Sequence, residues 1–372
     1  MPLQGEATAR RTYVNLERVL DGSQLVHRCE HAILGKRCAQ KTVRLSGTSV
    51  AAFEPWLLEE LDHPRITPVR EVQFDPQYEG HVTFVMPWYE GGSVARALIE
   101  GPPFSLAGSL SIMSDLLGAL EYLHTVKRYV HRDVKTDNVL LDGGRTTGFL
   151  SDFGLAAAIE SSGDAPAVLS TYEYMAPECA SDLRHAPQAD VYSAGMVLFE
   201  LLSGRIRWED LDRADVERRV TEGRRALPDS AYSASAFSPH VPDRLVRIVR
   251  KAIAAEMDRR YQTAAEFLRA LNQVVSIDWH ETEPETGEMC WLGTWPPQSR
   301  DDNRDEYRVT VRTMTKGPSS GLQRLVAHHR RPGGAAWRRA IPDRDVAVDD
   351  STGLRTFFAD VAASASHRRA AR

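Results

Sequence analysis

The sequence predicts an α+β protein in which strands and helices occupy different parts of the chain. Residues 13–45 form short alternating segments separated by turn residues, which is typical of antiparallel strands. Residues 111–125 instead carry apolar side chains at helical spacing. Near the C-terminus, residues 307–312 alternate again. A β-rich part, a helical part and a small β-containing module are therefore expected in that order.

Within the first part, residues 26–29 alternate, residues 32–36 turn around Gly35, and residues 37–41 resume the alternation. This pattern predicts a β-hairpin. A helix is expected next, ending before the turn at residues 63–66. Because proline is tolerated only in the first turn of a helix, Pro55 predicts that this helix begins at Glu54.

Composition places the chain among ordinary globular proteins, with 372 residues of which 42% are hydrophobic and 26% charged. The net charge of -5 is spread along the chain and gives no general attraction to nucleic acid or membranes. Apolar runs such as residues 194–202 are shorter than the ~20 residues of a membrane-spanning helix. No signal peptide is evident. The four cysteines form no CxxC pair, which favours free thiols in a reducing cytoplasm over a metal site at Cys29, His31 and Cys38.

Three short motifs carry the chemistry of the chain. They are His131-Arg132-Asp133-Val134-Lys135-Thr136-Asp137-Asn138, Asp152-Phe153-Gly154 and Ala176-Pro177-Glu178, and together they span 48 residues. Phosphoryl transfer needs a carboxylate that orients the attacking hydroxyl, ligands for Mg²⁺ and a cation that holds the nucleotide phosphates. Asp133 can supply the first, Asn138 and Asp152 the second, and an upstream lysine the third.

On these motifs the chain resembles the eukaryotic-like (Hanks-type) serine/threonine protein kinases, particularly their bacterial branch. The resemblance covers residues 13–275. It implies a bilobal protein kinase fold, with a small β-rich N-lobe at about 13–86 and a larger α-helical C-lobe at about 90–275. Residues 276–372 would form a linker and a C-terminal accessory module of no recognised family.

The resemblance assigns four residues to catalysis. Asp133 would accept or orient the proton of the acceptor hydroxyl, and Lys135 would neutralise the transferred phosphoryl group. Lys41 would grip the α- and β-phosphates and pair with Glu54. Asn138 and Asp152 would hold Mg²⁺, and Mn²⁺ suits the same ligands. Glu178 would pair with Arg260, and Asp190 would brace the catalytic loop.

ATP is the implied nucleotide, and the resemblance also assigns its binding residues. These are Gly22, Val26, Ala39, Lys41, Met86, Pro87, Tyr89 and Leu140. The glycine-rich loop departs from the family pattern GxGxxGxV, because residues 19–26 hold one glycine, Gly22, beside the acidic Asp21. An acid near the phosphates would weaken nucleotide binding.

The segment between Gly154 and Ala176 is the expected site of regulation. Arg132 would dock a phosphate carried by this segment. The possible acceptors are Ser161, Ser162, Ser170, Thr171, Tyr172 and Tyr174. Ser161 and Ser162 lie in a stretch with Gly, Asp and Pro, whereas Thr171 is expected to bond Asp133 instead. The alternative is a polar segment that carries no modification.

The predicted function is transfer of the γ-phosphoryl group of ATP to Ser/Thr hydroxyls of protein substrates, with autophosphorylation, in bacterial signalling. Two alternatives remain open at this point. A pseudokinase scaffold that transfers nothing is favoured by the degenerate glycine loop. A small-molecule kinase such as an aminoglycoside phosphotransferase uses the same His-x-Asp arrangement as His131-Arg132-Asp133. It would not be expected to carry Ala176-Pro177-Glu178 together with Arg260.

The C-terminal region begins with an acidic stretch, expected to form a linker at 277–287, and contains four of the seven tryptophans. This composition is unlike a disordered tail. Residues 307–342 hold eight Lys or Arg and no acid, which could attract nucleic acid or an acidic partner. A solvated face balanced by neighbouring acids is the simpler alternative, so nucleic acid is not expected. The module is a candidate docking site for the kinase domain or a partner protein.

Overall fold

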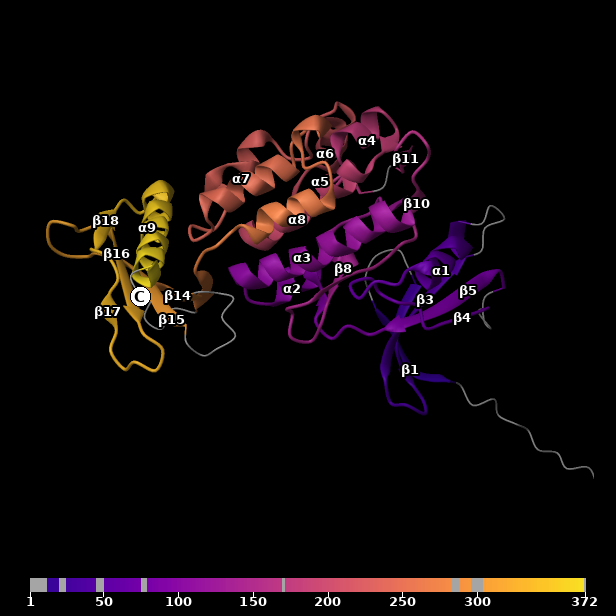
Figure 1. The fold of residues 1–372 in the computed structure, drawn as a ribbon, viewed down its shortest axis with the longest axis horizontal. Coiled ribbons are helices and arrows are strands. Elements are labelled where there is room, and N and C mark those ends of the chain that lie inside the picture. The colour runs from indigo at the N-terminus through magenta and orange to yellow at the C-terminus, as the bar shows by residue number, and fades with distance from the viewer. Residues whose placement is uncertain are drawn as a thin grey trace, which may run out of the picture.

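The computed structural model describes residues 12–19, 25–44, 50–74, 79–168, 171–282, 288–295 and 304–370. Along the chain these residues form a five-stranded sheet with one helix, then a mainly helical part, then a second sheet covered by a helix (Figure 1). The α+β class and the bilobal arrangement are confirmed. No helix in the described ranges is long and apolar enough to cross a bilayer.

The N-lobe is an antiparallel sheet with strand order β1-β2-β3-β5-β4. Its elements are β1 (Tyr13–Val19), β2 (Leu25–His31), β3 (Arg37–Arg44), α1 (Val50–Glu60), β4 (Glu71–Phe74) and β5 (His81–Pro87). The predicted hairpin is confirmed as β2 and β3, with Gly35 at a positive φ of 60° in the turn. Cys29 lies opposite Cys38 in this register, and both are buried free thiols.

Helix α1 begins four residues earlier than predicted, so the expectation that it starts at Glu54 is wrong. Pro55 lies inside the helix. A proline removes one N–H and crowds the carbonyl four residues before it, which here belongs to the first turn. Leu57 and Leu58 are 1% and 2% exposed, and burying two leucines offsets the loss of one hydrogen bond.

The C-lobe is built around helices. They are α2 (Val94–Glu100), α3 (Leu106–Tyr122), α4 (Pro177–Ser181), α5 (Pro187–Ser203), α6 (Arg213–Thr221), α7 (Asp243–Ala252) and α8 (Ala264–Asn272). The predicted helix at 111–125 is confirmed as α3, but it begins at Leu106 because Ser105 accepts a hydrogen bond from the Gly108 amide and caps it. Helix α5 is central, and all of its residues from Ala189 to Leu202 are buried.

Short elements join these helices and carry the loops between them. The strands are β6 (Gly92–Ser93), β7 (Tyr129–Val130), β8 (Val139–Leu141), β9 (Gly148–Leu150), β10 (Ala157–Ala158), β11 (Ala165–Pro166) and β12 (Arg184–His185). The helical turns are η1 (Leu123–Lys127), η2 (Thr136–Asn138), η3 (Trp208–Asp210), η4 (Asp229–Tyr232), η5 (Ala234–Ala236) and η6 (Met257–Arg259). Strands β8 and β9 form a hairpin that follows η2 and delivers the chain to Asp152.

The C-terminal module is a twisted antiparallel sheet covered on one face by a long helix. Its elements are β13 (Asp278–Thr282), β14 (Met289–Trp295), β15 (Asp305–Thr313), β16 (Gln323–Arg330), β17 (Arg338–Arg339), β18 (Arg344–Val346) and α9 (Ser351–Ala370). The predicted strand at 307–312 is confirmed as part of β15, where Tyr307, Val309 and Val311 face the core. Phe357 and Phe358 of α9 close this core.

A long linker is not present at the start of this module. Ile277 and Trp279 are 0% and 1% exposed and belong to the core of the module, so the expectation of a tether across 277–282 is wrong. Residues 283–287 lie outside the described residues. Ile277 and Trp279, two positions apart, pack under α9, and this packing places the chain in the sheet as β13.

The module contacts the C-lobe directly, at α3 and at the segment before α7 (Figure 1). The Arg355 guanidinium of α9 donates to the carbonyls of Val241, Ala234 and Phe237 at 2.7, 2.6 and 3.0 Å. Asp278 accepts a 2.8 Å hydrogen bond from the Ala107 amide at the start of α3.

Candidate active site

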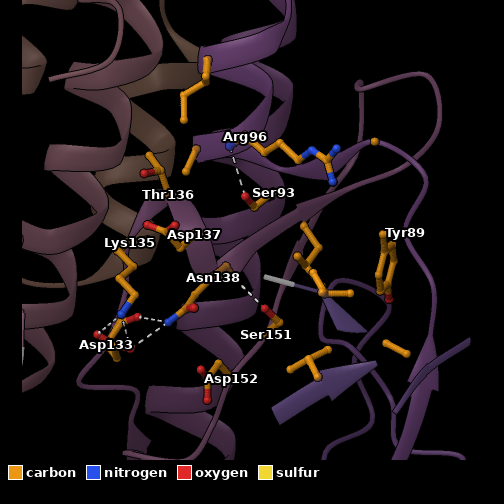
Figure 2. A pocket seen from close by; sticks show the side chains of 18 of the residues that line it. Tyr89, Ser93, Arg96, Asp133, Lys135, Thr136, Asp137, Asn138, Ser151 and Asp152 are labelled. Atoms are coloured by element: carbon orange, nitrogen blue, oxygen red, sulfur yellow. Dashed lines mark hydrogen bonds and ion pairs between the residues drawn. The ribbon is translucent and has the colours of Figure 1, made fainter. Parts of the chain in front are cut away.

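A cavity of about 670 Å³ lies between the two lobes and gathers the residues that the sequence assigned to catalysis, nucleotide binding and metal binding. Those of them that the structure describes all line it: Val26, Ala39, Lys41, Glu54, Met86, Pro87, Tyr89, Asp133, Lys135, Asn138, Leu140 and Asp152. Figure 2 shows Asp133, Lys135 and Asn138 pointing toward one another, with Asp152 close by. Gly22 lies outside the described residues.

An ion pair between the sheet and α1 fixes the lysine of this cavity. Lys41 Nζ on β3 lies 2.8 Å from both carboxylate oxygens of Glu54 on α1 and 2.8 Å from Oδ1 of Asp152. The side chains of Lys41 and Glu54 are each 4% exposed. The N-lobe sheet, α1 and the loop after β9 therefore meet at one ammonium group.

The charges of this network are set by burial and by one another. Burial alone would lower the pKa of Lys41, but the carboxylates of Glu54 and Asp152 outweigh it and raise that pKa. Burial likewise opposes ionisation of Asp152, yet the Lys41 ammonium and the Gly154 amide hold the pKa of Asp152 below its usual range. A charged lysine and an ionised aspartate are thus both present in the cavity at neutral pH.

The Asp133 carboxylate is oriented by three side chains. Lys135 Nζ donates to its two oxygens at 2.8 and 3.0 Å, and Thr171 Oγ1 donates at 3.0 Å. Asn138 Nδ2 donates to Oδ2 at 2.9 Å (Figure 2). The predicted contact of Thr171 with Asp133 is confirmed, and Lys135 reaches Thr171 at 3.4 Å.

The oxygen atoms of Asn138 and Asp152 fit a hard divalent cation. Asn138 Nδ2 is committed to the Asp133 carbonyl at 2.8 Å and to the Asp133 carboxylate, so the amide oxygen points away from that carboxylate. Asp152 has a φ of 61°, a left-handed conformation that is rare outside glycine and clusters at functional sites. Phe153 anchors this turn by packing edge-on against the His131 ring at 4.8 Å.

A buried aspartate braces the loop from below. Asp190 is 0% exposed and accepts from the amides of His131 at 2.7 Å and Arg132 at 3.0 Å, which confirms its predicted bracing role. Two histidines that sequence reasoning missed complete its shell: His124 Nε2 at 2.8 Å and His185 Nε2 at 2.9 Å. Burial opposes the charge on His185, but the Asp190 carboxylate raises the pKa of His185 to about 10.

The candidate regulatory residues do not gather at one point. Arg132 donates to backbone carbonyls, those of Leu155, of Ala156 at 3.4 Å and of Pro166 at 2.5 Å. Ser161 and Ser162 are exposed and lie outside the cavity. Ser170 lies outside the described residues. A phosphate-docking role for Arg132 stays a prediction.

The segment that follows is anchored to the end of the C-lobe. Arg260 reaches the two carboxylate oxygens of Glu178 at 2.6 and 2.7 Å, so the pair predicted from positions 82 residues apart is confirmed. The Arg260 guanidinium also lies 4.8 Å above the Tyr192 ring of α5.

Comparison with known proteins decides the family. A family model for the protein kinase domain matches residues 22–273, which is 252 of the 372 residues. The chain belongs to the protein kinase family.

Relatives of this kinase come from several bacteria. It is 30% identical over 260 residues to the serine/threonine-protein kinase PrkC of Bacillus subtilis, covering 67% of this chain and 38% of PrkC. It is 32% identical over 255 residues to the DNA damage-responsive serine/threonine-protein kinase RqkA of Deinococcus radiodurans, covering 66% and 36%. For the probable serine/threonine-protein kinase PknB of Lactococcus lactis the values are 26% over 283 residues, 74% and 43%. The chain thus spans about two fifths of the length of these curated relatives.

The kinase has further cavity residues that sequence reasoning missed. Glu200, a buried acid on α5, accepts from Tyr174 Oη, from Thr136 Oγ1 at 3.2 Å and from the Ile206 amide at 2.9 Å. These side chains link η2 to the segment before α4 in the wall of the cavity. An acid between Phe199 and Leu201 was the available signal, because buried acids need partners.

Proposed function

We propose that this kinase transfers the γ-phosphoryl group of ATP to serine and threonine hydroxyls of proteins. The observation that carries the proposal is the Asp133 carboxylate, held by Lys135, Asn138 and Thr171 in one cavity with the Lys41 ammonium. The serine/threonine kinases named among the relatives support the same acceptor class. Autophosphorylation and a role in bacterial signalling are proposed on the same basis.

Each side chain has a defined task in this reaction. Asp133 orients the acceptor hydroxyl and takes up its proton, because a carboxylate held by three donors is a fixed acceptor. Lys135, 2.8 Å from that carboxylate, lies where it can neutralise the transferred group. Lys41 holds the nucleotide phosphates and is itself held by Glu54.

Asn138 and Asp152 would hold the divalent metal, for which we propose Mg²⁺, with Mn²⁺ suited to the same oxygen ligands. When bound, that ion would supply positive charge to the nucleotide phosphates. At the other end of the cavity, Val26, Ala39, Met86 and Leu140 provide an apolar slot for the adenine. The Pro87 carbonyl and the Tyr89 amide would bond its edge.

A substitution at Asp133 separates an enzyme from a pseudokinase scaffold. Asp133→Asn is expected to abolish transfer of labelled phosphate while ATP affinity is retained, because Asp133 acts on the acceptor and not on the nucleotide. Asp229→Asn is a suitable control, since that aspartate is 86% exposed and remote from the cavity. Wild-type autophosphorylation in the Asp133→Asn protein would rule out the assignment. A wild type that binds ATP but transfers nothing would establish the scaffold.

We propose a kinase domain at residues 13–275 and an accessory module at residues 276–372. Two separate hydrophobic cores support this division, one ending at Val274 and the other beginning at Ile277. The role proposed for the module is to set kinase activity or to recruit a protein partner. Truncation at Val275 should then change autophosphorylation rate or substrate choice, and a truncated protein equal to full length in both would contradict this. A cytoplasmic location stays a prediction of the sequence.

The basic stretch of the module is partly neutralised, which favours a protein partner over nucleic acid. Four of its eight cations pair with acids outside the stretch: Arg312 with Glu288, Arg324 with Asp345, Arg330 with Glu306, and Arg339 with Asp343. Arg308 and Arg330 lie 4.8 and 4.7 Å from the Trp337 ring. An arginine that is already paired with a carboxylate or stacked on a tryptophan attracts a phosphate less strongly.

A further inference from the structure

The activation segment, here residues 152–178, folds back on itself in a hairpin near its middle. The Glu160 amide donates to the Asp164 carbonyl at 2.8 Å, and the Gly163 amide donates to the Glu160 carbonyl at 3.0 Å. Gly163 has a φ of 93°, which only glycine adopts readily. The local sequence therefore favours this turn, which forms without phosphorylation of the segment.

One arginine outside the segment closes this hairpin. Arg184 Nη2 lies 2.7 Å from Glu160 Oε2, and Arg184 Nε lies 3.0 Å from Asp164 Oδ1. The same Nη2 donates to Ser162 Oγ at 3.1 Å, and Ser162 Oγ donates to Asp164 Oδ1 at 2.6 Å. A guanidinium fork that grips two carboxylates and a hydroxyl is the kind of contact that a phosphorylated segment would make with an arginine.

Strand β12 connects this contact to the catalytic loop. Side chains alternate across a strand, so Arg184 and His185 point to opposite sides. Arg184 faces the hairpin, whereas His185 bonds Asp190, which in turn holds the amides of His131 and Arg132. The backbone of β12 also pairs with β11 within the segment. Order in the hairpin is thereby coupled to the position of the loop that carries Asp133.

Arg132 has a different role in the same segment. Its guanidinium joins the carbonyls of Leu155 and Ala156 to that of Pro166, and so ties the beginning of the segment to β11. Ordered carbonyls supply its partners in place of an anion.

We infer that Arg184 is a positioning residue that keeps the activation segment in its ordered form through Glu160 and Asp164, so that two carboxylates serve where a phosphate would otherwise be required. This inference rests on the proposed kinase activity. It specifies that the segment is competent without phosphate.

A phosphate on Ser162 would oppose this arrangement. The cluster holds one arginine and two carboxylates, a net charge of -1 from Arg184, Glu160 and Asp164. Phosphorylation would add about -1.5 to -2 charges next to an oxygen that already lies 2.6 Å from Asp164. Three anionic groups would then compete for one guanidinium. Modification of Ser162 is therefore expected to lower activity.

The test uses the full-length protein with Ser161, Ser162 and Ser170 all changed to Ala, and measures initial rates of labelled phosphate transfer to casein and to the Asp133→Asn chain. The rates are expected to stay within about two-fold of wild type, because the carboxylates of Glu160 and Asp164, which hold Arg184, are unchanged in this variant. A triple variant that is inactive beside an active wild type would overturn the inference. A wild type inactive toward both acceptors would instead overturn the proposed function.

A pair of charge insertions tests the cluster itself. Ser162→Glu should lower kcat about five-fold with KM for ATP unchanged, whereas Ser161→Glu, the same change one residue earlier with no contact to Arg184, should have no effect. Arg184→Gln should give a similar loss of kcat, restored in large part by Arg184→Lys. In the Arg184→Gln protein, the further change Asp164→Asn should cause no additional loss of kcat, since the two side chains act as one unit.

Thermal unfolding of each variant identifies losses that come from misfolding. A Ser162→Glu protein with activity equal to or above that of wild type would refute the inference. Additive losses of kcat from Arg184→Gln and Asp164→Asn, in proteins that unfold at the wild-type temperature, would also refute it.

Discussion

Replacing Arg260 with alanine should destabilise the kinase domain far more than the same change at its neighbour Arg259. The Arg260 side chain is 0% exposed, and its partner Glu178 is 17% exposed. Its guanidinium also satisfies the carbonyls of Ala254 at 2.6 Å and Ala255 at 2.7 Å. Removing it leaves a carboxylate and several carbonyls without their donors in a place that water reaches poorly.

The expected loss of unfolding free energy in Arg260→Ala is set by these lost contacts. Breaking a buried pair by removal of one partner costs about 3–5 kcal/mol, because the remaining charge stays buried and uncompensated. For a domain of this size each kcal/mol lowers the unfolding midpoint by roughly 2–4 °C, so the Arg260→Ala midpoint should fall by roughly 6–20 °C. Arg259 is 71% exposed and lies 3.6 Å from Glu256, so Arg259→Ala should cost at most about 1 kcal/mol.

Urea and thermal unfolding followed by circular dichroism measure both variants under the same conditions. The double variant Glu178→Gln with Arg260→Met, which removes both charges, should recover part of the loss. Arg260→Ala within 1 kcal/mol of Arg259→Ala would refute this reasoning, since it would mean that water or a local rearrangement satisfies Glu178 at little cost.

Three further changes test other parts of the molecule. Asp152→Ala should remove the Mg²⁺-dependent part of ATP affinity in calorimetry, and a variant that keeps the wild-type gain in affinity on addition of Mg²⁺ would contradict its assignment as a ligand. His185 has a folded pKa of about 10 against 6.5 when unfolded, so its contribution is fully present below pH 6.5 and is lost as the pH rises toward 10. The unfolding midpoint of wild type should therefore fall over this range, and that of His185→Phe should fall less; parallel curves would argue against the pair with Asp190. Arg355→Ala should loosen the module and speed hydrogen exchange in residues 234–241, whose carbonyls it binds, and unaltered exchange there would show that the contact is dispensable.

Local sequence determined the elements whose signal lies in nearby residues. The hairpin of β2 and β3 follows from alternation around a glycine turn, and β15 follows from alternation over 307–312. The order of the three catalytic motifs was sufficient to assign Asp133, Asn138 and Asp152, because the chemistry of phosphoryl transfer restricts both residue type and spacing. The partner of Glu178 was also predictable, since an arginine at that position completes the same motif set.

Only the tertiary structure decided where local preference and long-range packing disagreed. Pro55 argued for a helix start at Glu54, but α1 begins four residues earlier, at Val50, and holds Pro55 inside a helix whose leucines are buried. Residues 277–282 looked like an acidic tether, yet Ile277 and Trp279 lie in the core of the module. The motif set pointed to Arg132 as the arginine that contacts the activation segment, and nothing in the local sequence indicated Arg184. The folding of β10, β11 and β12 against the catalytic loop places carbonyls around Arg132 and carboxylates around Arg184. Burial and pairing are properties of the assembled fold, because they require residues distant in the chain to meet.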